Sequence, residues 1–180
     1  PDVILIGEIR TRETMEQAIV FAETGHLVLA TLHSNNANQA LDRIIGFFPE
    51  DSRRQLLMDL SLNLKAVVAQ QLIPRQGAKG RCAAIEILIN TPLAADMIRR
   101  GEVEKLKDLM KKSREHGMVT FDQALQELCE QGTISYQDAL RFADSPNEVR
   151  LMIKLESSGV QRERLEQGLE GMSLVDKDED

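Results

Sequence analysis

The apolar run at positions 3–6 constrains the fold more than any other feature of the sequence. Its residues, Val-Ile-Leu-Ile, follow one another without polar alternation, which is typical of a strand buried on both faces inside a parallel sheet. Such a strand needs neighbours on either side. Because only Pro1 and Asp2 precede the run, little of the chain is available upstream to supply them. We therefore expect the chain to be a fragment of a longer protein.

Strand and helix patterns alternate after this run. Residues 11–23 place apolar side chains at helical spacing and stop before Gly25, which suits a helix C-terminus. Residues 26–32 form a second apolar run, and helical patterns follow at 40–45 and after Pro49. A strand-helix-strand-helix order predicts the α/β class with a parallel sheet.

The middle of the chain predicts a β-hairpin, and the part after it predicts short helices. Residues 66–73 and 81–89 read as the two strands, although the first segment could instead extend the preceding helix. Thr91 and Pro92 have the pattern of a helix N-cap followed by a proline in the first turn. Capping-box spacing recurs at Thr120, Ser135 and Ser145. We expect a compact all-helical subdomain here.

Charge and composition exclude several classes of function. From residue 157 onward the chain has seven acidic and three basic residues, so this tail carries −4 of the net charge of −7. A nearly balanced body with 3% aromatic residues predicts no nucleic-acid partner. No apolar run approaches the length of a membrane span, so we expect no direct membrane insertion. The cysteines, Cys82 and Cys129, predict neither a disulfide nor a metal site and fit a reducing cytoplasm.

Gly7 and Glu8 end the first apolar run and form the first candidate site. A carboxylate just past the C-terminal end of a parallel strand lies where α/β sheets bind their ligands. In phosphoryl transfer that position suits a residue that orients or deprotonates the attacking water. Gly7 would let the backbone come close to a phosphate or metal. On spacing alone, a solvated glutamate at a strand end is the commoner explanation for Glu8.

His26 and His33 bracket the second apolar run. Their separation of seven residues is odd, so on an ideal strand they point to opposite faces and lie at opposite ends, which argues against a shared metal site. His33 falls at the same edge as Glu8 and begins a polar loop suited to sensing a phosphate. A histidine that only bonds the start of the next helix explains His33 equally well. His116, before Gly117, fits a contact with a helix dipole.

Together the two apolar runs resemble motifs of a known family. The segment PDVILIGEIR at 1–10 is similar to the Walker B segment of the type II/type IV secretion ATPases, in which the glutamate after the glycine is catalytic. The segment TGHLVLATLHSN at 24–35 is similar to the His box of that family, whose second histidine approaches the terminal phosphate of ATP. The resemblance implies that Glu8 activates water and that His33 senses the phosphate. It also implies that Gly7, Arg10 and His26 contribute to nucleotide binding, with His26 supporting the loop.

Within that family the likeness is greatest to the retraction motors of type IV pili, over residues 1 to about 155. After Thr91 and Pro92, Ala95 replaces an arginine of the principal motor, and this departure resembles an accessory paralogue. No GxxxxGK followed by Ser or Thr occurs. The phosphate cradle and the magnesium ligand are therefore expected before Pro1, and the chain alone should bind ATP poorly.

The resemblance implies a complete functional assignment. Residues 1–90 would be the C-terminal part of a RecA-like ATPase domain, 91–156 a helical C-terminal subdomain, and 157–180 a disordered acidic tail. With ATP and Mg²⁺, a homo-hexamer would power pilus retraction and twitching motility. It would work in the cytoplasm, peripheral to the inner membrane, with the principal retraction ATPase and an inner-membrane platform protein as its partners.

Other interpretations stay open. The chain could belong to a non-hydrolysing partner subunit of a motor ring, or to a related secretion or pilus assembly ATPase. A helix-turn-helix DNA-binding module at residues 120–145 is disfavoured, because its second helix is nearly neutral. Arg10 and Arg12 fit either subunit contacts or local ion pairs. A solvated face explains the following basic cluster better than a contact surface: Arg99, Arg100, Lys105, Lys107, Lys111 and Lys112.

Overall fold

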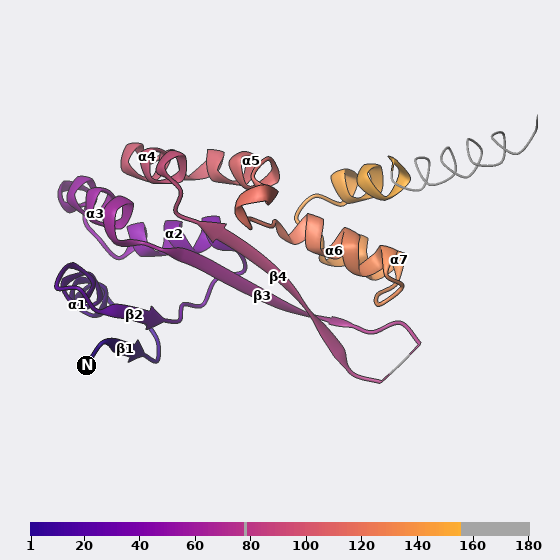
Figure 1. Ribbon diagram of the computed structural model, residues 1–180, viewed down its shortest axis with the longest axis horizontal. Coiled ribbons are helices and arrows are strands. Elements are labelled where there is room, and N and C mark those ends of the chain that lie inside the picture. The colour runs from indigo at the N-terminus through magenta and orange to yellow at the C-terminus, as the bar shows by residue number, and fades with distance from the viewer. Residues whose placement is uncertain (78, 156–180) are drawn as a thin grey trace, which may run out of the picture.

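The computed structural model describes residues 1–77 and 79–155 (Figure 1). The predicted acidic tail at 157–180 and Ala78 of the predicted hairpin turn lie outside the described residues. The first half of the chain contains β1 (Val3–Ile6), α1 (Arg12–Glu23), β2 (Leu27–Ala30), α2 (Ala37–Gly46), α3 (Glu50–Asn63), β3 (Ala66–Pro74) and β4 (Arg81–Ile89). The second half contains α4 (Pro92–Arg100), α5 (Leu106–Lys111), α6 (Phe121–Glu130) and α7 (Tyr136–Phe142), with single 3₁₀ turns at Val103–Lys105 and Arg114–His116. Residues 146–155 are also helical.

The predicted α/β class is confirmed. β1 pairs with β2 in parallel, in a register that runs from Val3 opposite Leu27 to Ile6 opposite Ala30. α1 connects the two strands and packs against β2 and α3. The parallel pairing and the helical crossover are those expected of a strand-helix-strand unit.

The prediction that β1 is buried on both faces is wrong for this chain. Four apolar residues of the two strands have about half or more of their surface exposed: Val3 (51%), Leu5 (75%), Leu27 (48%) and Leu29 (49%). The register puts the four on one face of the sheet, whereas Ile6 and Val28 pack into the core on the other. The reason is that, among the described residues, β1 and β2 form a two-stranded sheet and no layer covers its second face. This surface is called the bare sheet face below.

The hairpin of β3 and β4 passes from the part of the molecule that contains α2 and α3 to the part that contains α6 and α7 (Figure 1). Its antiparallel register runs from Ala66 opposite Ile89 to Pro74 opposite Arg81, so the segment after α3 is a strand and not an extension of that helix. α6 packs on β4 and α7 on β3. One core collects side chains from both sides of residue 90, including Leu41, Leu56, Leu88, Ile98 and Leu106; a second contains Ile73, Ala84, Phe121, Leu125 and Ile134.

Local capping sets the start of several helices, as the sequence predicts. The Thr91 side chain accepts a hydrogen bond from the Ala94 amide and precedes Pro92 at the first position of α4. Thr120 and Gln123 form a complete capping box at the start of α6. Asn36, rather than Asn35, caps α2 through the Gln39 amide.

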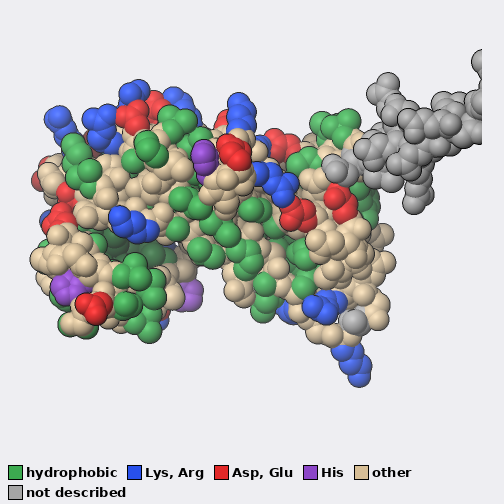
Figure 2. Space-filling model, viewed as in Figure 1, with side chains coloured by type: hydrophobic (Ala, Val, Ile, Leu, Met, Phe, Trp, Pro, Cys, Tyr) green, Lys and Arg blue, Asp and Glu red, His purple; other side chains and the backbone are tan. Residues whose placement is uncertain are grey.

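Several residues of the basic cluster form local ion pairs, and Figure 2 shows basic and acidic side chains side by side over α4 and α5. Arg99 and Arg100 both bind Asp96, and Lys105 binds Glu102. Lys107 and Lys111 instead reach Asp144 and Glu148, beyond α7. Lys107 and Lys111 therefore connect α5 to the segment that follows α7. Within the described ranges, no helix combines the length and the apolar composition that a membrane crossing requires.

Leu88 and Leu5 provide a test of where the core lies. Leu88 has no exposed surface and Leu5 lies on the bare sheet face. Leu88→Ala should lower the free energy of unfolding by about 2–5 kcal/mol, because it leaves a cavity, whereas Leu5→Ala should cost less than about 0.5 kcal/mol. Urea denaturation of the 180-residue chain measures both. Equal losses would contradict the placement of the core.

Candidate active site

The parallel register brings Glu8 and His33 together at one edge of the sheet. Beyond the ladder, the Ile9 amide donates to the Thr31 carbonyl at 2.9 Å, and the Thr31 hydroxyl donates to the Gly7 carbonyl. These two hydrogen bonds continue the pairing of the two segments past the ends of β1 and β2. As a result the His33 Nε2 lies 3.2 Å from the Glu8 Oε1.

Arg10 contacts the second oxygen of the same carboxylate. Its Nη2 lies 2.5 Å from the Glu8 Oε2, so the carboxylate is held between a guanidinium and an imidazole. The Glu8 side chain is only 19% exposed, whereas the side chains of Arg10 and His33 are 72% and 77% exposed. The two exposed groups therefore orient Glu8 and contribute little to stability, as is usual for ion pairs in contact with water.

Charge at this edge keeps Glu8 ionised. The hydrogen bond from Arg10 is the main cause of a lowered Glu8 pKa, and the charges of Arg10, His33 and Arg43 act in the same direction against desolvation. A carboxylate with a lowered pKa is an acceptor at neutral pH. Each of its oxygens has a second lone pair beyond the one that faces Arg10 or His33.

His26 does not join this group. It lies before the N-terminal end of β2, and its Nδ1 is 3.1 Å from both the Phe21 carbonyl oxygen and the Thr24 Oγ1. The edge of its ring also meets the Phe21 ring, with centroids 6.2 Å apart. These contacts stabilise the turn between α1 and β2, at the opposite end of the strand from Glu8.

Gly7 has no structural reason to be glycine within the described residues. Its φ is not among the positive values of the chain, and a Cβ added to it would meet no atom within 4 Å. Neither backbone strain nor packing therefore requires glycine here. The small residue leaves the backbone beside Glu8 open to a close approach from outside.

Sequence reasoning missed two residues that shape this region, Thr31 and Glu86. Glu86 is 2% exposed. Its Oε1 accepts the Ala37 amide at 2.7 Å and its Oε2 accepts the Phe121 amide at 3.1 Å. Burial is the main cause of its raised pKa, against the two amides that lower it. The available signal was a single carboxylate within the apolar strand CAAIEILI.

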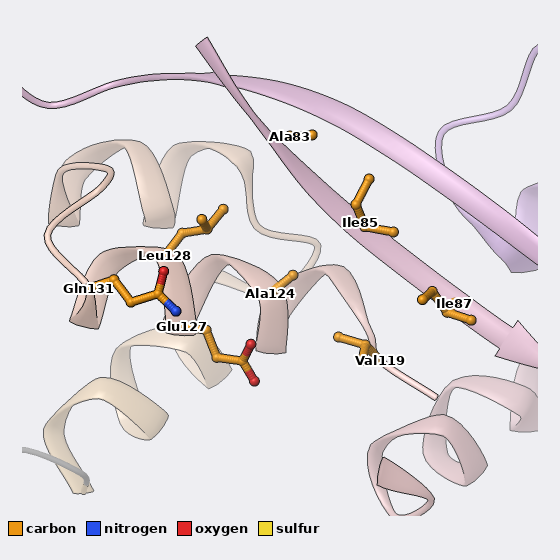
Figure 3. Close-up of a pocket in the computed structure, with 8 residues that line it drawn as sticks. All are labelled: Ala83, Ile85, Ile87, Val119, Ala124, Glu127, Leu128 and Gln131. Atoms are coloured by element: carbon orange, nitrogen blue, oxygen red, sulfur yellow. The ribbon is translucent and has the colours of Figure 1, made fainter. Parts of the chain in front are cut away.

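A shallow pocket lies elsewhere, between β4 and α6 (Figure 3). It encloses about 240 Å³ and is lined by Ala83, Ile85, Ile87, Val119, Ala124, Glu127, Leu128 and Gln131. This lining is mostly apolar and contains no cation, so it is poorly suited to a phosphate. Among the residues that the structure describes, no group of three or more His, Cys, Asp or Glu side chains is arranged to hold a metal ion.

Comparisons with known proteins agree on one family. A family model described as Type II/IV secretion system protein matches residues 1–141. The type IV pilus ATPase PilU of Pseudomonas aeruginosa is 63% identical over 180 residues, covering 100% of this chain and 47% of the relative. The type IV pilus retraction ATPase PilT of the same organism is 39% identical over 146 residues, covering 81% of this chain and 42% of the relative. The chain thus spans less than half the length of these two relatives.

A solved structure extends the likeness to the fold. The crystal structure of the pilus retraction motor PilT with bound ADP is 38% identical and superimposes with a TM-score of 0.74. The match covers 82% of this chain and 41% of that chain. The mixed α/β fold described above is therefore similar to part of a pilus retraction motor of known structure.

Arg10→Gln tests the electrostatics of this edge. Because the Arg10 hydrogen bond is the main cause that lowers the Glu8 pKa, its loss should raise that pKa towards the ordinary glutamate value. NMR titration of the Glu8 side-chain carboxyl measures the change. Arg12→Gln is the matched control, since Arg12 pairs with Glu16 instead. A Glu8 pKa that moves equally in both variants, or in neither, would contradict the assignment.

Proposed function

We propose that this chain, which belongs to the Type II/IV secretion system protein family, supplies the hydrolytic edge of an ATPase site in a type IV pilus motor. The observation that carries the proposal is the Glu8 carboxylate, held ionised at the C-terminal ends of two parallel strands by Arg10 and His33. That position is where α/β sheets bind their ligands. The named relatives supply the reaction, ATP hydrolysis.

Glu8 would orient and deprotonate the attacking water. Its unshared lone pairs can accept a hydrogen bond from a water molecule, and its ionised state makes it a base at neutral pH. His33 would detect the terminal phosphate, because its exposed ring can turn from Glu8 to a phosphate oxygen with little loss of packing. Gly7 would let that phosphate approach the backbone. His26 would act indirectly, by fixing the start of β2.

ATP and Mg²⁺ would be held mainly by residues outside this chain. Mg²⁺ usually keeps several waters and takes one or two carboxylates together with substrate phosphates, so a single nearby carboxylate such as Glu8 is compatible with it. The sequence has no phosphate-cradling loop, and the relatives are about twice as long. We place that loop before Pro1 in the complete protein, in a segment that would also cover the bare sheet face.

In the cell we assign the chain to a homo-hexameric motor that powers pilus retraction and twitching motility. The resemblance of the sequence after Thr91 and Pro92 to an accessory paralogue supports a role beside a principal retraction ATPase, and the identity is higher to PilU (63%) than to the retraction ATPase PilT (39%). Such a motor would work in the cytoplasm and reach the inner membrane through a platform protein of the pilus machine.

Glu8→Gln in the complete protein tests the hydrolytic role. ATP turnover should fall by more than about 100-fold, because the amide cannot take the proton from water, while nucleotide binding and assembly persist. Glu23→Gln, at the exposed end of α1, is the matched control and should leave turnover unchanged. A steady-state phosphate-release assay measures both. Turnover retained in Glu8→Gln would refute the proposal.

His33→Ala tests the phosphate contact separately. Turnover should fall about tenfold or more, because a donor to the terminal phosphate is lost. His116→Ala is the control, since His116 lies at a distant helix end. An unchanged rate in His33→Ala would leave His33 with a structural role only.

The chain without the rest of its protein should bind ATP poorly. Residues 1–180 contain no phosphate-cradling loop, so isothermal titration with ATP and Mg²⁺ should show no binding in the micromolar range. Micromolar binding would show that these residues hold the nucleotide without a further segment.

A further inference from the structure

Glu86 joins two helix N-termini that are far apart in the sequence. Ala37 is the first residue of α2 and Phe121 the first residue of α6. Both have backbone amides that no turn of their own helix can satisfy. One oxygen of Glu86 accepts each amide. A single buried carboxylate therefore fixes the distance between these two helices.

The α2 end of this bridge leads directly to the candidate active site. His33 lies four residues before Ala37, in the short loop between β2 and α2. Asn36 in that loop caps α2. A displacement of the first residue of α2 must therefore move the loop that carries His33.

The α6 end leads to the C-terminal helices. Asp122, the residue after Phe121, is also buried and accepts the amides of Asp144 and Ser145 at 2.8 and 3.1 Å. Ser145 directly precedes the helix at 146–155. The Asn38 side chain adds a second link, because it donates to the Val103 carbonyl at 3.0 Å.

We propose that Glu86 is a positioning residue that couples the His33 loop to the C-terminal helices. It acts on hydrolysis through His33, so the proposal rests on the proposed function. A shift of α6 reaches the His33 loop through the two oxygens of one carboxylate. A movement of the C-terminal helices would thereby change the position of His33 and, with it, the rate of hydrolysis. The proposal assigns no contact between Glu86 and the nucleotide.

A double-mutant cycle in the complete protein tests this coupling. Glu86→Gln keeps the size of the side chain but presents an amide NH₂ where one acceptor was. It should lower kcat for ATP about tenfold, with little change in KM, because the loop is misplaced while the phosphate cradle is intact. In the His33→Ala background the same substitution should cost less than about twofold. Equal losses in both backgrounds would overturn the proposal.

Asp122→Asn is the matched control. Asp122 is equally buried, accepts two backbone amides and has a pKa raised mainly by burial, as Glu86 has. Its carboxylate accepts the amides of the segment after α7, so this substitution leaves the Glu86 bridge between α2 and α6 in place. Asp122→Asn should change kcat less than about twofold in either background. A loss as large as that of Glu86→Gln that persists in the His33→Ala background would show that general loosening, not coupling, explains the effect.

Amide hydrogen exchange separates failure of this inference from failure of the proposed function. In Glu86→Gln, protection should fall both at Phe121 and at the hydrogen-bonded amides of Asn35 and Ala37; in Asp122→Asn it should fall only at 144–145. Loss of protection at Phe121 alone would overturn the coupling, whatever the ATPase activity. If His33→Ala alone leaves kcat unchanged, the proposed phosphate contact of His33 fails and exchange still decides the coupling. If Glu86→Gln does not fold, Glu86→Asp, which keeps the charge but is one methylene shorter, replaces it.

Discussion

The parallel pairing of β1 with β2 fixes the positions of Glu8 and His33 relative to each other. Side chains of a strand alternate between faces at a rise of about 3.3 Å per residue. A slip of one position would therefore move Glu8 away from His33 and exchange the buried and exposed faces of the strand. The register is held by the packing of Ile6 and Val28 below the sheet and by the two Thr31 bonds beyond its end. The site thus depends on a pairing of only four residues per strand.

Two buried carboxylates, Glu86 on the hairpin and Asp122 on α6, position the helices in the rest of the molecule. A buried carboxylate is costly unless hydrogen bonds satisfy it, and removal of one partner leaves an uncompensated charge. Glu86 meets this condition with two helix amides, and Asp122 does so with the amides before the helix at 146–155. Exposed ion pairs such as Lys111 with Glu148 add less, because water screens them. The polar groups that determine helix placement are therefore those in the interior.

The sequence predicts the local features of this fold well. The helix caps at Thr91 and Thr120, the hairpin and the strand-helix-strand order all follow from residues within a few positions of one another. The closeness of Glu8 and His33 was also predictable, because each follows an apolar run typical of a parallel strand, and parallel strands end at the same edge of the sheet. Their chemical roles rest on resemblance, because spacing alone equally permits a solvated glutamate and a structural histidine.

Long-range features were beyond a single sequence. Glu86 accepts hydrogen bonds from amides 49 and 35 residues away. The apolar residues around it in the sequence predict that it is buried, but they do not predict which groups it binds. The exposure of Leu5 was missed because an apolar run predicts a strand with two covered faces, whereas coverage depends on which other layers are present. The pairing of Lys107 with Asp144 was missed for a similar reason, since nearer acidic residues offered a local explanation.

The most direct test of the central claim is a structure of the complete protein with Mg²⁺ and a non-hydrolysable ATP analogue. We predict that the His33 ring contacts the terminal phosphate and that a water within about 3 Å of the Glu8 carboxylate faces the terminal phosphorus atom. A nucleotide bound with its terminal phosphate at another edge of the sheet, out of reach of both residues, would contradict the account.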